Sequence, residues 1–241
     1  MAPGSIEEFA KLVGYASMAG VTVIIGGLLA WANLLPRNEL GEEISHGLVA
    51  FGGGVLIAAV AFVLTPTGME LLALPVLMLT FLGGVFSVFL LDRLIAQRAG
   101  AGGQLMAMVL DFAPEAIALG AVFSSNHRTG LLLAFFIGIQ NLPESYNAFG
   151  ELVHARFSPN KALLVLAPFS LVGIVAAVAG ALLLAGHDRA IASLMLFSAG
   201  GIIYLIFQDV APLARLERHW SPAIGAPLGF LVGMIGVRVL A

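Results

Sequence analysis

The chain of 241 residues contains no cysteine and few charged residues, and both absences narrow its function. Without cysteine it has no disulfides and no thiolate metal site. Asp, Glu, Lys and Arg make up 10% of the residues, whereas a soluble domain carries about 25%. No basic run and no nucleic-acid-binding motif is present, which argues against DNA or RNA as a partner.

Hydrophobic residues make up 60% of the chain, and the mean hydropathy is +1.02. These values predict an integral membrane protein that has the lipid bilayer as its surroundings. Because one crossing needs about 20 apolar residues, we predict eight transmembrane helices, at residues 9–35, 44–64, 69–91, 104–123, 130–151, 162–185, 190–210 and 223–240. The connections are short, so we expect the all-α class, with residues 1–241 forming a single polytopic domain.

The basic residues predict how these helices are oriented. Cytoplasmic connections carry an excess of Lys and Arg, and placing both termini outside puts seven such residues inside and four outside. The inside set is Arg37, Arg93, Arg98, Arg156, Lys161, Arg215 and Arg218. The residues before the first predicted span include Glu7 and Glu8, whereas a removable signal peptide begins with basic residues. We therefore expect the first span to be retained. No transit peptide is evident, which favours a prokaryotic inner membrane.

Two similar blocks, residues 111–115 (Asp-Phe-Ala-Pro-Glu) and 140–144 (Gln-Asn-Leu-Pro-Glu), interrupt the apolar sequence of the fourth and fifth spans. Each block places an oxygen-bearing side chain four residues before a glutamate, so both side chains lie on one helix face. The proline before each glutamate leaves one carbonyl, of Leu110 or Ile139, without its helical partner. In lipid, such a carbonyl must be satisfied by protein, water or an ion. The blocks therefore predict two kinked helices that hold a site.

The acids of these blocks are costly to bury. Left ionised and unpaired in a membrane, Asp111, Glu115 and Glu144 would together cost about 8–10 kcal/mol. The fourth and fifth spans contain no Lys or Arg, which leaves protons or a bound cation to neutralise the acids. With the amide oxygen of Gln140, the three carboxylates form an oxygen shell that suits Mn²⁺, Fe²⁺ or Mg²⁺ and that Zn²⁺ also accepts. The alternative is that the acids are protonated and hydrogen-bonded to the free carbonyls.

Three further residues are secondary candidates for metal binding. Asn141 serves either an adjacent metal position or a hydrogen bond between helices. Asp209, at the end of the seventh span, lines an exit or marks the membrane interface. His46 follows Glu42 and Glu43 at the start of the second span, where acids more often cap a helix than bind a metal. The other histidines fall in predicted loops without metal-ligand spacing, and we expect them to be solvated; they are His127, His154, His187 and His219.

Small residues recur at helical spacing in several spans. Gly225, Gly229 and Gly233 form a stripe along the last span, and residues 52–54 and 83–84 are also glycine. Such stripes let helix backbones approach closely. We expect them to pack helices within one chain, with a homodimer interface as the alternative.

The paired blocks resemble those of the ZIP (Zrt/Irt-like) family of divalent-metal transporters. In that family the fourth span carries His-Asn-x-Pro-Glu-Gly and the fifth His/Gln-x-x-Pro-Glu. The glycine-rich stretches at 50–54 and 198–204, and the orientation with both termini outside, are similar as well. The resemblance implies an eight-helix bundle in which Asp111, Glu115 and Glu144 bind the transported ion together with Gln140.

This chain departs from the family pattern at several positions. Asp111 stands where the family has histidine, Phe112 replaces the asparagine that would serve a second metal, and Ala116 and Ser145 replace glycines. The sixth span has no acid, so we expect one metal position. The connection at residues 92–103 has no histidine, which argues against a histidine-based sensor there. Exchanging a nitrogen ligand for a carboxylate predicts selectivity for harder ions than zinc, or coupling to protons.

We therefore expect a carrier, and not an enzyme, that passes zinc, manganese or iron toward the cytoplasm by alternating access. The metal ion is then the transported substrate, and we expect no cofactor. The main alternative is a metal-binding sensor or paralogue without flux. A membrane enzyme would use the acids for metal-assisted or acid–base chemistry, but no nucleophile elbow, His-Glu-x-x-His motif or phosphate-binding arginine set accompanies them.

Overall fold

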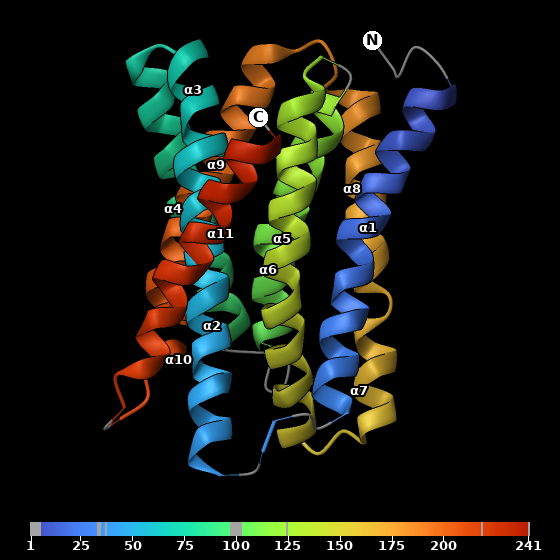
Figure 1. Ribbon diagram of the computed structural model, residues 1–241. Helices are drawn as coiled ribbons and strands as arrows, with labels where there is room; N and C mark the ends of the chain where they lie inside the picture. Colours follow the sequence, from blue (N-terminus) through green and yellow to red (C-terminus); the bar gives the residue numbers. More distant parts are fainter. Residues whose placement is uncertain are drawn as a thin grey trace.

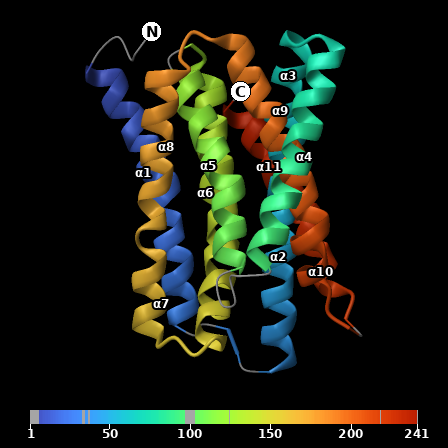
Figure 2. The same ribbon diagram turned by 180° about the vertical axis from the view of Figure 1, so that it is seen from behind.

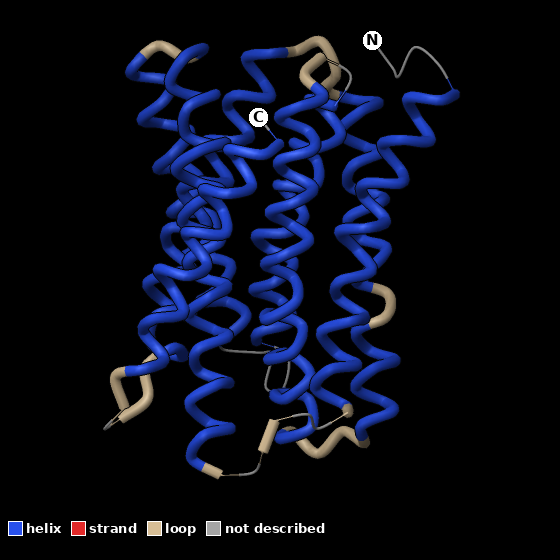
Figure 3. Tube along the Cα trace, viewed as in Figure 1, coloured by secondary structure: helices blue, strands red, loops and turns tan. Residues whose placement is uncertain are grey.

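The computed structural model describes residues 6–32, 35–36, 38–96, 103–123, 125–217 and 219–240. Long helices run side by side in alternating directions through the whole molecule (Figure 1; Figure 3). Apart from one isolated bridge between Leu216 and His219, the described residues contain no β-structure. The all-α class is therefore confirmed for this part of the chain. Arg37, Arg98 and Arg218, used above to predict the orientation, lie outside the described residues.

The described residues form eight helical rods that follow one another along the chain, and each overlaps one predicted span. In chain order they are α1 (Ile6–Trp31); α2 (Glu39–Ala59) with η1 (Val60–Leu64) and α3 (Thr65–Leu71); α4 (Leu74–Ala96); α5 (Gly103–Phe123); α6 (His127–His154); α7 (Pro159–Leu166) with α8 (Phe169–Leu183); α9 (Asp188–Leu205) with η2 (Ile206–Val210) and α10 (Ala211–Ala214); and η3 (Ser221–Ile224) with α11 (Gly225–Leu240). Six rods within the described residues are long and apolar enough to cross a membrane, and the other two, α5 and α6, hold the two blocks. Eight crossings thus remain a prediction.

Two features of the rods differ from the predicted spans. The second rod does not end at Leu64 but runs to Leu71, and α4 begins at Leu74 and not at residue 69. Pro66 lies inside this rod, directly after the π-helical segment η1, and such local widening of a helix accommodates a proline. The predicted span 162–185 is interrupted, because Pro168 separates α7 from α8.

The rods form two bundles that share a limited contact. Bundle A consists of α1, α5, α6, α7 and α8, and bundle B of α2, α3, α4, α9, α10 and α11; η1, η2 and η3 belong to bundle B. Within bundle A, α6 packs on α1 and α5, and α8 packs on both of these; within bundle B, α2 packs on α11 and α4 on α9. The bundles meet mainly where α2 touches α6 and where α9 touches α5. Figure 2 shows the two groups side by side.

Bundle B contains an internal repeat. Residues 50–66 and 196–212 align without a gap, and the alignment superimposes the π-helical segments η1 and η2 as well as Pro66 and Pro212. The two copies run in opposite directions through the molecule (Figure 1). Repeats of this inverted kind underlie many transporter folds.

Glycine fixes how each copy of the repeat packs. A Cβ on Gly54 of α2 would collide with the carbonyl oxygen of Ala226 in α11, and one on Gly200 of α9 with that of Phe81 in α4. Gly229 likewise faces the Phe51 carbonyl of α2. The predicted packing of glycine stripes within one chain is confirmed at these contacts.

Replacing Gly54 by alanine is expected to destabilise the fold, because the new methyl group must push α11 away from α2. Overpacking of this kind costs about 1–3 kcal/mol. The matched control is Gly14→Ala in α1, where an added Cβ meets nothing within 4 Å and helix propensity favours alanine. Denaturant titration of both variants in detergent would measure the difference; equal stability would contradict the close α2–α11 contact.

Candidate metal site

The polar residues of the two blocks lie together between α5 and α6, two helices that lie next to each other (Figure 1). Both helices continue through Pro114 and Pro143. Glu115, Gln140 and Asn141 are 0% exposed, Asp111 is 5% exposed, and Glu144 is half-buried. The fold thus brings all four predicted ligands to one place inside the protein.

The site residues form two pairs because α5 and α6 are antiparallel and each block has the same four-residue spacing. Gln140 Nε2 donates a hydrogen bond of 2.6 Å to Glu115 Oε2. The carboxyl groups of Asp111 and Glu144 form the second pair and lie next to each other. Four residues correspond to a rise of about 6 Å along a helix, so the two pairs lie roughly one turn apart.

Five oxygen atoms in these blocks are buried and have no hydrogen-bond partner. They are Asp111 Oδ1, Glu115 Oε1, Gln140 Oε1, Asn141 Oδ1 and Glu144 Oε2. Among the described residues, no other buried side-chain nitrogen or oxygen is left without a partner. Burying such an acceptor unpaired costs about 1–3 kcal/mol. Every one of them can accept from a donor or coordinate a cation, and none can donate as it stands.

The ligands are paired and do not form a closed shell. Within the described part of the chain, no three His, Cys, Asp or Glu side chains converge closely enough to hold one metal ion. Each of the four predicted ligands nevertheless keeps one oxygen atom without a partner, so an ion could bind through these atoms once the side chains come closer together.

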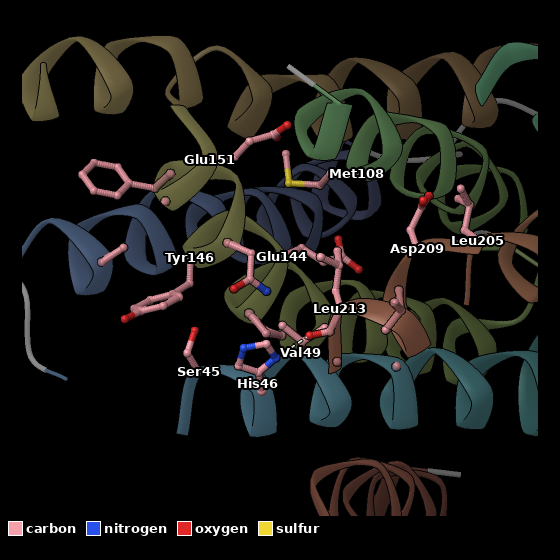
Figure 4. Close-up of a pocket in the computed structure, with 18 of the residues that line it drawn as sticks. Ser45, His46, Val49, Met108, Glu144, Tyr146, Glu151, Leu205, Asp209 and Leu213 are labelled. Atoms are coloured by element: carbon pink, nitrogen blue, oxygen red, sulfur yellow. Dashed lines mark hydrogen bonds between the residues drawn. The ribbon is translucent and has the colours of Figure 1, made fainter. Parts of the chain in front are cut away.

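A cavity of about 830 Å³ begins at Asp111 and Glu144 and lies between the two bundles. It extends toward the start of α2 and the ends of α6 and α10, as the labelled side chains in Figure 4 show. Glu115 and Gln140 do not line it. Its acidic lining residues are Asp92, Asp111, Glu144, Glu151 and Asp209. No Lys or Arg of the described residues lines it, so its electrostatic field favours cations.

The three secondary candidates have different surroundings. Asp209 and His46 both line the cavity, and His46 Nδ1 lies 2.6 Å from the carbonyl oxygen of Leu213. Asn141 instead donates from Nδ2 to the carbonyl oxygen of Ala19 in α1, at 3.0 Å. This contact matches the expectation that Asn141 joins two helices.

The predicted cap at the start of α2 needs correction. The capping residue is Asn38, whose side chain accepts from the backbone N–H of Gly41. Glu43 instead contacts His219 Nδ1 at 2.8 Å and accepts a hydrogen bond from the Ser221 hydroxyl. The sequence could not reveal this, because the two segments lie at opposite ends of the chain.

Of the four histidines predicted to be solvated, His127, His154 and His187 are exposed, whereas His219 is half-buried against Glu43. His127 stacks on Phe123 with ring centroids 4.7 Å apart, and His154, the last residue of α6, lines the cavity. Asp92, at the end of α4, also lines it and accepts a hydrogen bond of 2.8 Å from Tyr204. In the sequence, the only indication that Asp92 could have a functional role is its negative charge directly after the predicted span 69–91.

Comparison with known proteins identifies the family. The model of the ZIP zinc transporter family matches residues 97–241, which include both blocks. The mouse (Mus musculus) protein "Zinc transporter ZIP4" is 29% identical over 133 residues, which are 53% of this chain and 20% of the mouse protein. The match therefore spans about a fifth of that relative's length. Because the family model covers more than half of the sequence, the chain belongs to the ZIP zinc transporter family, as the two blocks on α5 and α6 indicated.

Proposed function

We propose that this protein carries divalent metal ions across a membrane and binds them between α5 and α6 through Asp111, Glu115, Gln140 and Glu144. The observation that carries the proposal is the group of five buried oxygen atoms without partners. A divalent ion would satisfy several of these acceptors at once and offset the charge of the carboxylates. No Lys or Arg occurs in α5 or in the two blocks, and none of the described residues that line the cavity is Lys or Arg.

The ligand atoms suggest which ions bind. All four proposed ligands offer oxygen, which suits manganese and iron and is accepted by zinc. A single metal position is supported by Phe112, which stands where the family pattern has the asparagine that would serve a second metal. Its ring offers no ligand atom, is 0% exposed and packs against Gly173 of α8.

Alternating access is supported by a difference between the two ends of the site: one end opens into the cavity, and the other is covered by apolar side chains. On one side the cavity leads to Asp111 and Glu144. Toward the other side, Glu115 is covered by the buried apolar core, in which Leu119 and Phe136 are 1% and 0% exposed. A smaller pocket of about 300 Å³ lies beyond this layer, between α3, α9 and the α5–α6 connection. Movement of bundle A against bundle B would open that side and close the cavity.

The direction of transport follows from the predicted orientation. α1 begins and α11 ends at the end of the molecule away from the cavity (Figure 1). If that end is outside, as the basic residues predict, the cavity faces the cytoplasm. The proposed carrier then delivers the ion inward, in the inner membrane of a cell.

Metal flux into liposomes tests the proposal. Purified protein is reconstituted around a trapped metal-sensitive dye, and zinc, manganese, iron and magnesium are added outside in turn. We expect saturable uptake of at least one ion, and uptake at the protein-free background for Glu115→Ala/Glu144→Ala, because half of the ligands are lost. A folded wild-type protein that moves none of these ions would contradict the carrier and favour a sensor or paralogue without flux.

A further inference from the structure

Trp220 is the most exposed large apolar side chain among the described residues, at 91%. It directly precedes η3, in the connection between α10 and α11. The chain has one other tryptophan, Trp31, which is the last residue of α1, is 47% exposed and donates from Nε1 to Asn160 Oδ1 at 3.3 Å. Exposing an indole to water is unfavourable because of its large apolar ring, so the position of Trp220 calls for a physical explanation.

The residues on both sides of Trp220 are attached to the start of α2. His219 Nδ1 lies 2.8 Å from Glu43 Oε1, and the Ser221 hydroxyl donates a hydrogen bond to the same carboxylate. Pro222, the next residue, is buried. These contacts hold the backbone on either side of the indole, so the exposure of Trp220 is built into the connection.

The helix that follows Trp220 presents an apolar face to its surroundings. Ser221–Leu240 is long and apolar enough to cross a membrane, and most of it is not buried within the protein. Exposed apolar side chains recur along it at helical spacing, namely Ile224, Leu228, Leu231 and Ile235. Trp220 comes four residues before this row. It therefore lies where the apolar helix begins.

On the other side of Trp220 the chain is polar. Arg215 and Glu217 are exposed and follow directly after α10. Because charged side chains are costly in the hydrocarbon core, this connection marks the boundary of the membrane. Figure 1 and Figure 2 show the connection protruding from the side of bundle B, at the end of the molecule where α1 ends. Both tryptophans of the chain thus belong to the same end.

We propose that Trp220 anchors bundle B in the lipid headgroup region, with its ring toward the acyl chains and its Nε1 hydrogen toward headgroup oxygen atoms or water. Tryptophan is enriched at this depth of membranes because the indole combines an apolar body with one N–H donor. Since Glu43 contacts both neighbours of Trp220, the anchor acts on α2 as well as on α11. The competing occupant is a second copy of this chain that covers the indole.

Fluorescence from Trp220 alone tests the anchor. Trp31→Phe leaves Trp220 as the only tryptophan, and this protein is reconstituted without metal into phosphatidylcholine vesicles that carry bromine either near the headgroups or near the ends of the acyl chains. Bromine quenches an indole that lies at its own depth. We expect emission at a shorter wavelength than that of tryptophan in water, and stronger quenching by the shallow bromine than by the deep one.

The matched control carries its only tryptophan in the middle of a membrane helix. Phe86 of α4 is 63% exposed, so Phe86→Trp in a chain with Trp31→Phe/Trp220→Phe should be quenched more strongly by the deep bromine. If Trp31→Phe does not fold, the emission of the wild type minus that of Trp220→Phe supplies the same signal.

Three results would overturn the anchor. The first is emission like that of tryptophan in water without quenching, and the second is quenching by the deep bromine that equals or exceeds quenching by the shallow one. The third is a shift to shorter wavelength without quenching by either lipid; if this shift is lost when the protein is diluted into more lipid, a second copy covers the indole. Because neither metal nor flux enters the measurement, the anchor stands or falls separately from the proposed carrier.

Discussion

Replacing Glu144 by alanine is expected to abolish metal flux while the protein still inserts and folds. Glu144 of α6 lies next to Asp111 of α5 and lines the cavity. Its loss removes a ligand and a negative charge at the point where the ion passes from the site into the cavity. Since even outer partners of a metal ligand are worth about 10–100-fold in affinity, we expect uptake to fall at least about 100-fold.

The measurement is ion uptake by proteoliposomes that contain equal amounts of wild-type and variant protein. Glu39→Ala is the matched control, because Glu39 is an exposed acid in the first turn of α2 and lies outside the cavity. Elution as a single folded species in size-exclusion chromatography shows that insertion is intact. Uptake by Glu144→Ala at the level of Glu39→Ala would refute the assignment of the site to α5 and α6.

Replacing Asp111 by histidine is expected to shift selectivity toward zinc. The change introduces a nitrogen ligand and removes one of three carboxylates, so a softer ligand set faces the ion. We expect the ratio of zinc affinity to manganese affinity to rise at least about tenfold, a difference of about 1.4 kcal/mol in relative binding free energy. Competition between the two ions for binding to the purified protein measures this ratio.

Asp111→Asn is the control that separates charge from ligand chemistry. It removes the same carboxylate charge but again offers oxygen, so it should weaken binding of both ions without favouring zinc. Equal effects of histidine and asparagine on the zinc-to-manganese ratio would show that residue 111 does not bind the ion directly.

Much of the helical architecture could be predicted from sequence, because apolar runs of membrane-spanning length are a local property of the chain. Each predicted span corresponds to one rod. The errors are local too: Pro66 was accommodated inside the second rod, and Pro168 interrupted the sixth. A proline signals that a hydrogen bond is missing, but whether the helix continues depends on how the preceding turn adjusts, as the π-helical η1 does before Pro66.

The proximity of the four polar residues was also predictable, since each block has its polar side chains on one helix face and their burial is costly. Sequence alone determined the helical membrane class and the placement of acidic, oxygen-bearing side chains on two successive helices. Only the tertiary structure decided that Glu115 pairs with Gln140 and Asp111 with Glu144, that Asn141 reaches α1, and that His46 lies on the same cavity as the site. These contacts join residues far apart in the chain, and they depend on which helix faces meet when the bundles pack.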